Sequence, residues 1–149
     1  KSGQEIYDIL TENKLNASIY ITVNTLDYLK KGGRITPAVA LLGGMLKIKP
    51  ILQIQGEKLD SFAKTRTMAK GTKIMKEAIT KDIEERFGNY YHNVHICVAY
   101  TYDQEPALAL KKELEEMYPG EEIICDPLSL SVSCHIGPHS LAIAICKKI

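Results

Sequence analysis

The 149-residue sequence predicts an α/β protein of the α+β kind, with helices packed on a mixed β-sheet. Three observations support this fold class. Segments with helical spacing of apolar residues alternate with β-rich segments along the whole chain. Two β-rich segments, 47–55 and 58–64, are separated only by a short turn at Gly56, which indicates a β-hairpin. A content of 45% hydrophobic and 25% charged residues is ordinary for a globular domain and argues against disorder.

We expect residues 1–149 to form a single domain, because no linker or internal repeat divides the chain. No apolar run reaches the roughly 20 residues that cross a membrane, and no secretory signal pattern is present. The four cysteines contain no Cys-x-x-Cys pair, and such scattered cysteines are mostly buried thiols in a reducing compartment. These features favour a cytoplasmic protein.

The first third of the chain begins with an amphipathic helix. Ser2 can cap this helix, Glu5 lies in its first turn, and one face is formed by Ile6, Ile9 and Leu10. Residues 17–23 are mostly β-branched or aromatic and predict a strand. Asn24 or Thr25 precedes a short helix over 26–31, which Gly32-Gly33 ends, and a second short helix is expected over 36–46.

The middle third holds the clearest local signals. Residues 47–55 alternate as a strand, Gly56 supplies the turn, and 58–64 return as the partner strand. Over 67–87 apolar residues recur every four positions, which predicts a long amphipathic helix ending at Gly88; the recurring residues are Met75, Ile79, Ile83 and Phe87. Residues 92–101 alternate again and predict a strand.

The last third is expected to contain one helix and three short strands. Asp103 or Gln104 precedes the helix, which has Pro106 in its first turn and stops at Pro119-Gly120. The strands are expected over 122–125, 129–134 and 141–146, with a His-Ile-Gly-Pro turn between the last two. Tyr100 and Tyr102 continue the alternation of the preceding strand, so we expect both to pack in the core.

The charge distribution is uneven, although the formal net charge is only +1. Residues 30–76 contain eleven basic and two acidic side chains, whereas the rest of the chain contains eight basic and sixteen acidic ones. This basic segment supports an alternative function, a nucleic-acid or polyanion binding module. Phe62 is the one aromatic residue between Lys30 and Lys76, so partners for base stacking are scarce, and we expect no nucleic-acid binding.

Five residues are candidates for binding an anion. Gly33 and Arg34 follow a helix end, where glycine allows close backbone approach and the guanidinium supplies charge. Arg66 lies just before the long helix, whose N-terminus attracts anions. His135 and Gly137 lie in the tight turn between two expected strands, where a histidine can reach a ligand head group. The structural alternatives are a helix stop signal, a solvated arginine and a core histidine.

Catalytic and metal motifs are scarce. No P-loop, Gly-x-Ser-x-Gly segment or Cys–His nucleophile motif is present. Cys134 and His135 are neighbours on an expected strand, and such neighbours point to opposite faces. A mixed metal site of Cys134, His135 and His139 is the remaining alternative. We therefore expect a protein that is not an enzyme and that uses no metal and no cofactor.

The segment Leu26-Asp27-Tyr28-Leu29-Lys30-Lys31-Gly32-Gly33-Arg34-Ile35 resembles the Leu-x-Tyr-Leu-Lys-Lys-Gly-Gly-Arg-Ile signature of the DegV family. The resemblance continues through Leu42-Gly43, Leu46-Lys47-Ile48-Lys49-Pro50-Ile51, Gly56 and Lys64-Thr65-Arg66-Thr67. His135-Ile136-Gly137-Pro138 is similar to the closing His-Thr-Gly-Pro-Gly turn of that family. The matching blocks span almost the whole chain in the family's order.

The resemblance implies the C-terminal lobe of a two-lobed bacterial protein that binds a long-chain fatty acid between its lobes. It also implies a partner kinase that phosphorylates the bound fatty acid. The matching blocks belong to the second lobe only, so the missing N-terminal lobe is a further expected partner. The first residue is Lys1 and not methionine, which agrees with a processed product or a fragment.

The resemblance also assigns roles to the candidate residues. His135 corresponds to a family histidine near the fatty-acid carboxylate, and Arg34 and Arg66 correspond to arginines of the head-group chemistry or of kinase docking. Ile136 replaces the usual threonine of the closing turn, and His139 replaces its usual last glycine. Both departures lie beside the expected head-group site.

Overall fold

The structure is a computed structural model that describes residues 1–34, 48–56 and 58–149. The expected helix over 36–46 and the start of the expected strand at residue 47 lie outside the described residues. Along the chain the elements are α1 Gly3–Asn13, β1 Ala17–Thr22, α2 Asp27–Lys31, β2 Lys49–Ile54, β3 Leu59–Thr65, α4 Met68–Arg86, the 3₁₀ turn η1 Tyr91–Asn93, β4 Val94–Tyr100, α5 Glu105–Met117, β5 Ile124–Pro127, α6 Leu130–Ile136 and β6 Leu141–Lys147.

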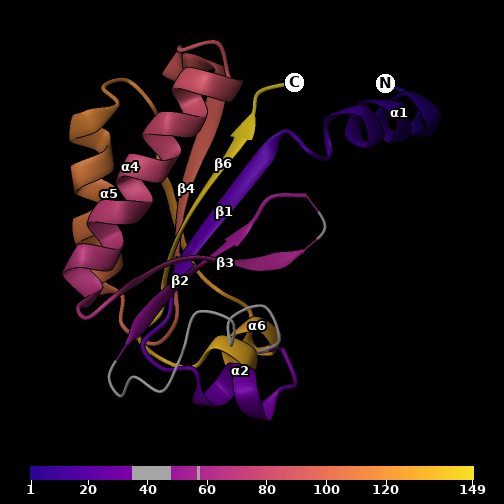
Figure 1. The fold of residues 1–149 in the computed structure, drawn as a ribbon. Helices are drawn as coiled ribbons and strands as arrows, with labels where there is room; N and C mark the ends of the chain where they lie inside the picture. Colours follow the sequence, from indigo (N-terminus) through magenta and orange to yellow (C-terminus); the bar gives the residue numbers. More distant parts are fainter. Residues whose placement is uncertain (35–47, 57) are drawn as a thin grey trace.

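The strands form one six-stranded mixed sheet in the order β3-β2-β1-β6-β4-β5 (Figure 1). All neighbouring strands are antiparallel except β4 and β5, which are parallel. The predicted hairpin is confirmed as β2 and β3, with Gly56 at a positive φ of 88° in the connection. The predicted fold class, helices packed on a mixed sheet with a hairpin, is therefore confirmed.

The two long helices α4 and α5 cover one face of the sheet and enclose the larger core cluster (Figure 1). Met75, Ile79 and Ile83 of α4 are buried there, as the four-residue spacing predicts. Thr67 caps α4, because its side chain accepts a hydrogen bond from the Lys70 amide. No helix in the described part of the chain is long and apolar enough to span a membrane.

The other face of the sheet carries a smaller cluster at one end. Leu29 of α2 and Ile136 of α6 pack there against Ile21, Leu52 and Ala142 of the central strands. Figure 1 shows α2 and α6 side by side below this end of the sheet. The two short helices therefore bring the Gly-Gly-Arg segment and the His-Ile-Gly-Pro segment, which are remote in sequence, to one place.

Helix α1 begins with a capping box, in which the side chains of Ser2 and Glu5 reach each other's backbone amides. Its predicted apolar face of Ile6, Ile9 and Leu10 forms but is not buried: Ile6 and Leu10 are 47% and 57% exposed and Ile9 is half-buried, while the neighbouring Tyr7 is 63% exposed. Figure 1 shows α1 projecting away from the sheet. An apolar helical face of this kind normally packs on another surface.

The sequence expectations for the last third need two corrections. The expected strand over 129–134 is wrong, since Leu130–Ile136 is helix α6 and His135 lies in its last turn. Within this helix both the amide and the hydroxyl of Ser133 donate to the Ser129 carbonyl, so local hydrogen bonds take the place of those from a neighbouring strand. Tyr102 does not pack in the core as expected: it is 80% exposed, because the chain leaves the sheet at a positive φ of 73° there.

Candidate functional site

The first group of candidate residues lies where α2 meets α6. Gly32 ends α2 and packs directly against the imidazole of His135, since a β-carbon at Gly32 would lie 2.7 Å from Nδ1 of His135. Gly137 packs in the same way on the ring of Tyr28, where a β-carbon would lie 2.4 Å from Cδ2. Both glycines therefore let two short helices approach each other closely.

Gly33 and Arg34 extend this group toward the surface. Gly33 has a positive φ of 67°, and the space beside it is open. The backbone then folds back, so that the Arg34 amide donates to the Leu29 carbonyl at 2.9 Å and its guanidinium donates to the Gly32 carbonyl at 2.7 Å. The guanidinium is thereby held beside the helix end while Arg34 remains exposed to solvent and to a ligand.

Buried hydroxyls fix the His135-Ile136-Gly137-Pro138 segment from behind. The hydroxyl of Thr101 donates to the Gly137 carbonyl at 2.7 Å and accepts from the Ser140 amide at 3.0 Å. His135 itself is half-buried on α6, and Cys134 beside it is exposed. The expected opposite orientation of these two residues on a strand no longer applies, because they are consecutive on a helix.

His139 occupies a glycine-like conformation, with a φ of 60°. The imidazole of His139 pairs with the carboxylate of Asp103. The centroid of the same imidazole lies 5.0 Å from that of the Tyr102 ring, in an edge-to-face arrangement. The pair of His139 and Asp103 lies on the surface, with both side chains more than two-fifths exposed.

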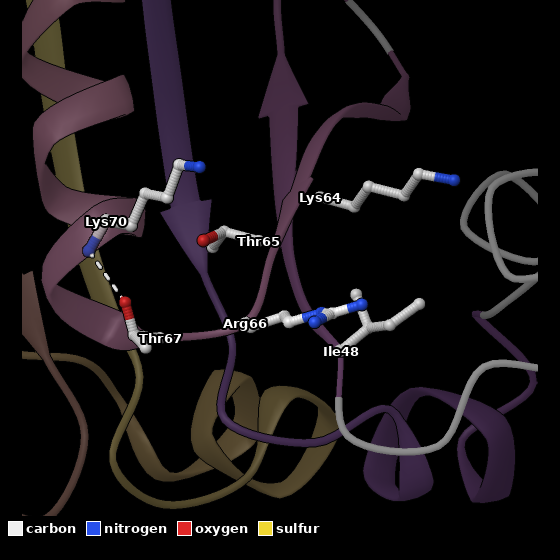
Figure 2. A pocket seen from close by; sticks show the side chains of 6 residues that line it. All are labelled: Ile48, Lys64, Thr65, Arg66, Thr67 and Lys70. Atoms are coloured by element: carbon white, nitrogen blue, oxygen red, sulfur yellow. Dashed lines mark hydrogen bonds between the residues drawn. The ribbon is translucent and has the colours of Figure 1, made fainter.

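Arg66 does not lie in the α2–α6 contact itself; it lines a separate cavity of about 380 Å³ where β3 passes into α4 (Figure 2). The other lining residues are Ile48, Lys64, Thr65, Thr67 and Lys70. The first turn of α4 carries no acidic side chain, so the positive end of the helix dipole adds to three basic side chains. The cavity is suited to an anion.

An apolar row crosses the open part of the second sheet face. Ile54, Ile19, Ala144 and Cys97 are paired side by side on β2, β1, β6 and β4, and Ile124 continues the row on β5. These five residues, which we call the apolar row, are half-buried or exposed. The row lies two residues along each strand, or roughly 7 Å, from the cluster under α2 and α6.

The remaining basic side chains of segment 30–76 do not form one surface. Lys76 pairs with Glu113 of α5 at 2.5 Å, Lys73 pairs with Glu77 at 3.9 Å, and Lys49 donates to the Asn24 carbonyl at 2.7 Å. These side chains are spread over β2 and α4. In the described structure the basic side chains of this segment therefore fall into three groups. Arg34 lies at the end of α2, Arg66 lies in the cavity at the start of α4, and the third group consists of solvated or paired lysines.

The cysteines are all free in the described structure, but the expectation of buried thiols holds only in part. Cys97 and Cys125 are half-buried, and burial raises the pKa of both thiols. Cys134 and Cys146 are exposed. Among the described residues no group of three metal-ligating side chains is present, so Cys134, His135 and His139 do not form such a group.

Several site features were not predicted from the sequence. Tyr28 was part of the family-like segment, but nothing in it indicated contact with Gly137. Thr65, Lys64 and Lys70 were not singled out, because only the three-dimensional turn from β3 to α4 gathers them around Arg66. The apolar row depends on strand order and register, and no short-range pattern carries either.

Residues 1–148 match a family model described as "Uncharacterised protein, DegV family". A DegV domain-containing protein of Clostridium perfringens is 37% identical to this chain over 145 residues. These residues cover 96% of this chain and 48% of that protein. A DegV domain-containing protein of Clostridium acetobutylicum is 33% identical over 144 residues, which cover 97% of this chain and 48% of that protein. The chain thus spans about half the length of these relatives.

Solved structures show the same fold. A stearic acid-binding protein from Eubacterium ventriosum superposes with a TM-score of 0.89 and is 25% identical, covering 99% of this chain and 50% of that one. DegV of Bacillus subtilis, described as a fatty acid binding protein, superposes with a TM-score of 0.80 at 28% identity, again over 99% of this chain and 50% of that one. The six-stranded sheet and its helices therefore correspond to one half of each of these proteins.

Proposed function

The chain belongs to the DegV family, and we propose that it is the fatty-acid-binding C-terminal lobe of a two-lobed carrier. The single observation that carries this proposal is the apolar row beside the α2–α6 corner, in a chain whose structural relatives include proteins described as binding stearic and other fatty acids. A fatty acid needs one apolar surface and a few polar groups for its carboxylate. The apolar row supplies the apolar surface, and the α2–α6 corner beside it supplies the polar groups.

The apolar row is the proposed surface for the acyl tail. Five strands at a spacing of about 4.8 Å span roughly 19 Å, a length that suits a long acyl chain. Ala144 and Cys97 are small, so they leave room above the sheet between the larger Ile54, Ile19 and Ile124. Each methylene group buried there contributes about 0.8 kcal/mol, so the tail dominates the affinity.

The α2–α6 corner is the proposed site for the carboxylate. The guanidinium of Arg34 and the imidazole of His135 supply donors, and Gly33 leaves open space beside them. Gly137 contributes by holding Tyr28 and α6 in place, and its carbonyl is already engaged by Thr101. Arg66 lies outside this corner, in a separate cavity of the same lobe, and is assigned to docking of the partner and not to the carboxylate.

We further propose that an N-terminal lobe covers the apolar row and the apolar face of α1. The relatives are about twice as long as this chain, and Ile6, Tyr7 and Leu10 present an apolar helical face to solvent. A fatty acid enclosed between two lobes is removed from water on both sides. We therefore expect the isolated chain to bind fatty acid weakly or not at all.

A fatty acid kinase is the proposed protein partner, and the carrier itself is proposed to be a binding protein and not an enzyme. Arg34 lies at the proposed head-group corner, and Arg66 lines a separate cavity of the same lobe. Positive charge there supports docking of an acidic or nucleotide-loaded surface through electrostatic complementarity. Arg66→Gln in the two-lobed protein should slow acyl phosphate formation by the kinase while leaving bound fatty acid unchanged; an unchanged rate would argue against this partner.

The test of fatty-acid binding is extraction of the purified two-lobed protein followed by mass spectrometry. We expect about one long-chain fatty acid per protein. Ala144→Phe fills the centre of the apolar row and should lower the bound fatty acid at least tenfold. Ala109→Phe adds the same ring to an exposed position of α5, on the opposite sheet face, and should leave the bound fatty acid unchanged.

Two results would overturn the proposal. One is a two-lobed protein that carries no lipid and takes up no added fatty acid. The other is an equal loss in the two variants, which would mean that the effect does not depend on the apolar row. Circular dichroism of both variants checks that each remains folded.

A further inference from the structure

We infer that the cavity at the start of α4 is a binding site for the phosphate group, either as free phosphate or as the phosphoryl end of a larger ligand. Residues 64–67 and Lys70, from the end of β3 and the first turn of α4, line this cavity together with Ile48. It differs from the proposed carboxylate corner of Arg34 and His135. The inference does not require the protein to bind fatty acid.

Helix α4, which has 19 residues, begins at this cavity. The amides of the first turn of a helix have no acceptor within the helix. The Lys70 amide is satisfied by the Thr67 hydroxyl at 3.2 Å, which leaves the amides of Met68 and Ala69 as donors of the first turn. Together with the helix dipole, such amides favour an oxyanion.

Thr65 points to a ligand independently of the helix end. The residue is only 6% exposed, and its hydroxyl Oγ1 has no hydrogen-bond partner among the described residues. No other buried side-chain oxygen or nitrogen in the described structure is unsatisfied. Figure 2 shows this hydroxyl at the centre of the lining residues, pointing toward the start of α4. A hydroxyl left without a partner inside a protein is unfavourable, and an oxygen of a bound anion supplies the missing acceptor.

The side chains that line the cavity carry positive charge. Lys64, Arg66 and Lys70 line the cavity, and no acidic side chain is among its lining residues. No ion pair of these three side chains is formed among the described residues. Three cations and a helix N-terminus match a doubly charged tetrahedral anion better than a single carboxylate. Phosphate and phosphate monoesters carry this charge and several acceptor oxygens.

The test is titration of the 149-residue chain with inorganic phosphate at constant ionic strength, followed by amide chemical shifts in NMR spectra. We expect saturable shifts at Thr65, Thr67 and Met68. Arg66→Gln should weaken phosphate binding at least tenfold. Lys73→Gln removes the same charge from an exposed position of α4 outside the cavity and should change the affinity less than twofold.

Thr65→Val provides a second variant with opposite expected effects. Loss of the hydroxyl should weaken phosphate binding at least threefold, yet raise the melting temperature of the phosphate-free protein by about 2–4 °C, because an unsatisfied buried group is removed. A Thr65 that only supports the fold would instead lower the melting temperature when replaced. That outcome, the absence of saturable phosphate binding, or an equal loss in Arg66→Gln and Lys73→Gln would overturn the inference.

A parallel titration with octyl phosphate distinguishes the two sources of the phosphate group, with octanol as the control for the alkyl chain. Affinity at least tenfold above that of inorganic phosphate, still lost in Arg66→Gln, identifies a lipid phosphate. Equal affinity for both identifies free phosphate or a polar phosphate ester. Failure of the proposed fatty-acid function would leave these titrations unchanged, since they depend on the cavity alone.

Discussion

The imidazole of His135 lies directly on Gly32, so close that a β-carbon at Gly32 would be 2.7 Å from Nδ1. This contact joins the end of α2 to the last turn of α6. The carbonyl of the same Gly32 accepts a hydrogen bond from the Arg34 guanidinium. The double glycine therefore does more than end a helix, since its first member positions a candidate ligand-binding side chain.

Gly137→Ala should destabilise the protein more than Gly33→Ala. Both glycines have positive φ, but Gly137 also has a ψ of 176°, in a region that almost only glycine occupies, and it packs on Tyr28. We expect a loss of about 3 kcal/mol for Gly137→Ala and about 1 kcal/mol for Gly33→Ala, where the space is open. Urea denaturation measures both losses. Equal losses would show that the contact with Tyr28 does not contribute to the difference in unfolding free energy.

Asp82→Ala should cost about 3 kcal/mol of unfolding free energy, because it breaks a buried polar network under α4. The Asp82 carboxylate accepts from the Tyr20 hydroxyl at 2.8 Å and pairs with Arg86 at 3.3 Å. Tyr20→Phe removes only one hydrogen bond and should cost about 1 kcal/mol. Thermal or urea unfolding of the two single variants and the double variant gives the coupling energy. A coupling near zero would contradict a shared network.

Glu121 should make stability fall at acidic pH. Lys148 donates a hydrogen bond to Glu121 at 2.7 Å and holds the pKa of that carboxyl below its usual 4.5; burial opposes this lowering and His92 adds to it. A lowered folded pKa means that the stabilisation is present above about pH 4.5 and is lost as the pH falls through the folded value.

Glu121→Gln should therefore lower stability at pH 6 and converge with the wild type near pH 3. Urea unfolding over this pH range measures the difference. Glu122→Gln is the matched control, because Glu122 is exposed and makes no ion pair within the described residues. A constant difference between wild type and Glu121→Gln at all pH values would contradict the assignment.

Bound fatty acid should protect Cys97 from thiol reagents. Cys97 is half-buried in the apolar row, and burial raises the pKa of its thiol, so we expect slower alkylation at pH 7.5 than for the exposed Cys134. Lipid removal from the two-lobed protein should accelerate labelling of Cys97 several-fold. Cys134 lies on α6 and serves as the internal control, measured by mass spectrometry in the same sample. Protection of both cysteines to the same extent would indicate a general change and not a tail on the row.

Local structure was predictable wherever its cause lies within a few residues. The Ser2–Glu5 capping box, the hairpin at Gly56 and the α4 stripe of Met75, Ile79 and Ile83 all follow from short-range geometry. Residues 129–134 were mispredicted because Leu130 and Val132 alternate with serines, a pattern that fits a strand as well as a short helix. Side-chain hydrogen bonds within α6 and its packing on α2 decide between the two.

The sequence by itself determined most of the described elements, the family and the position of Arg66 before a helix. Only the tertiary structure decided that His135 rests on Gly32, that Ile19, Ala144 and Cys97 share one row, and that Thr65 is buried without a partner. The physical reason is the range of the interactions. Caps and helical spacing act between neighbours in the chain, whereas strand register, close glycine contacts and the burial of a hydroxyl depend on residues brought together only by the complete sheet.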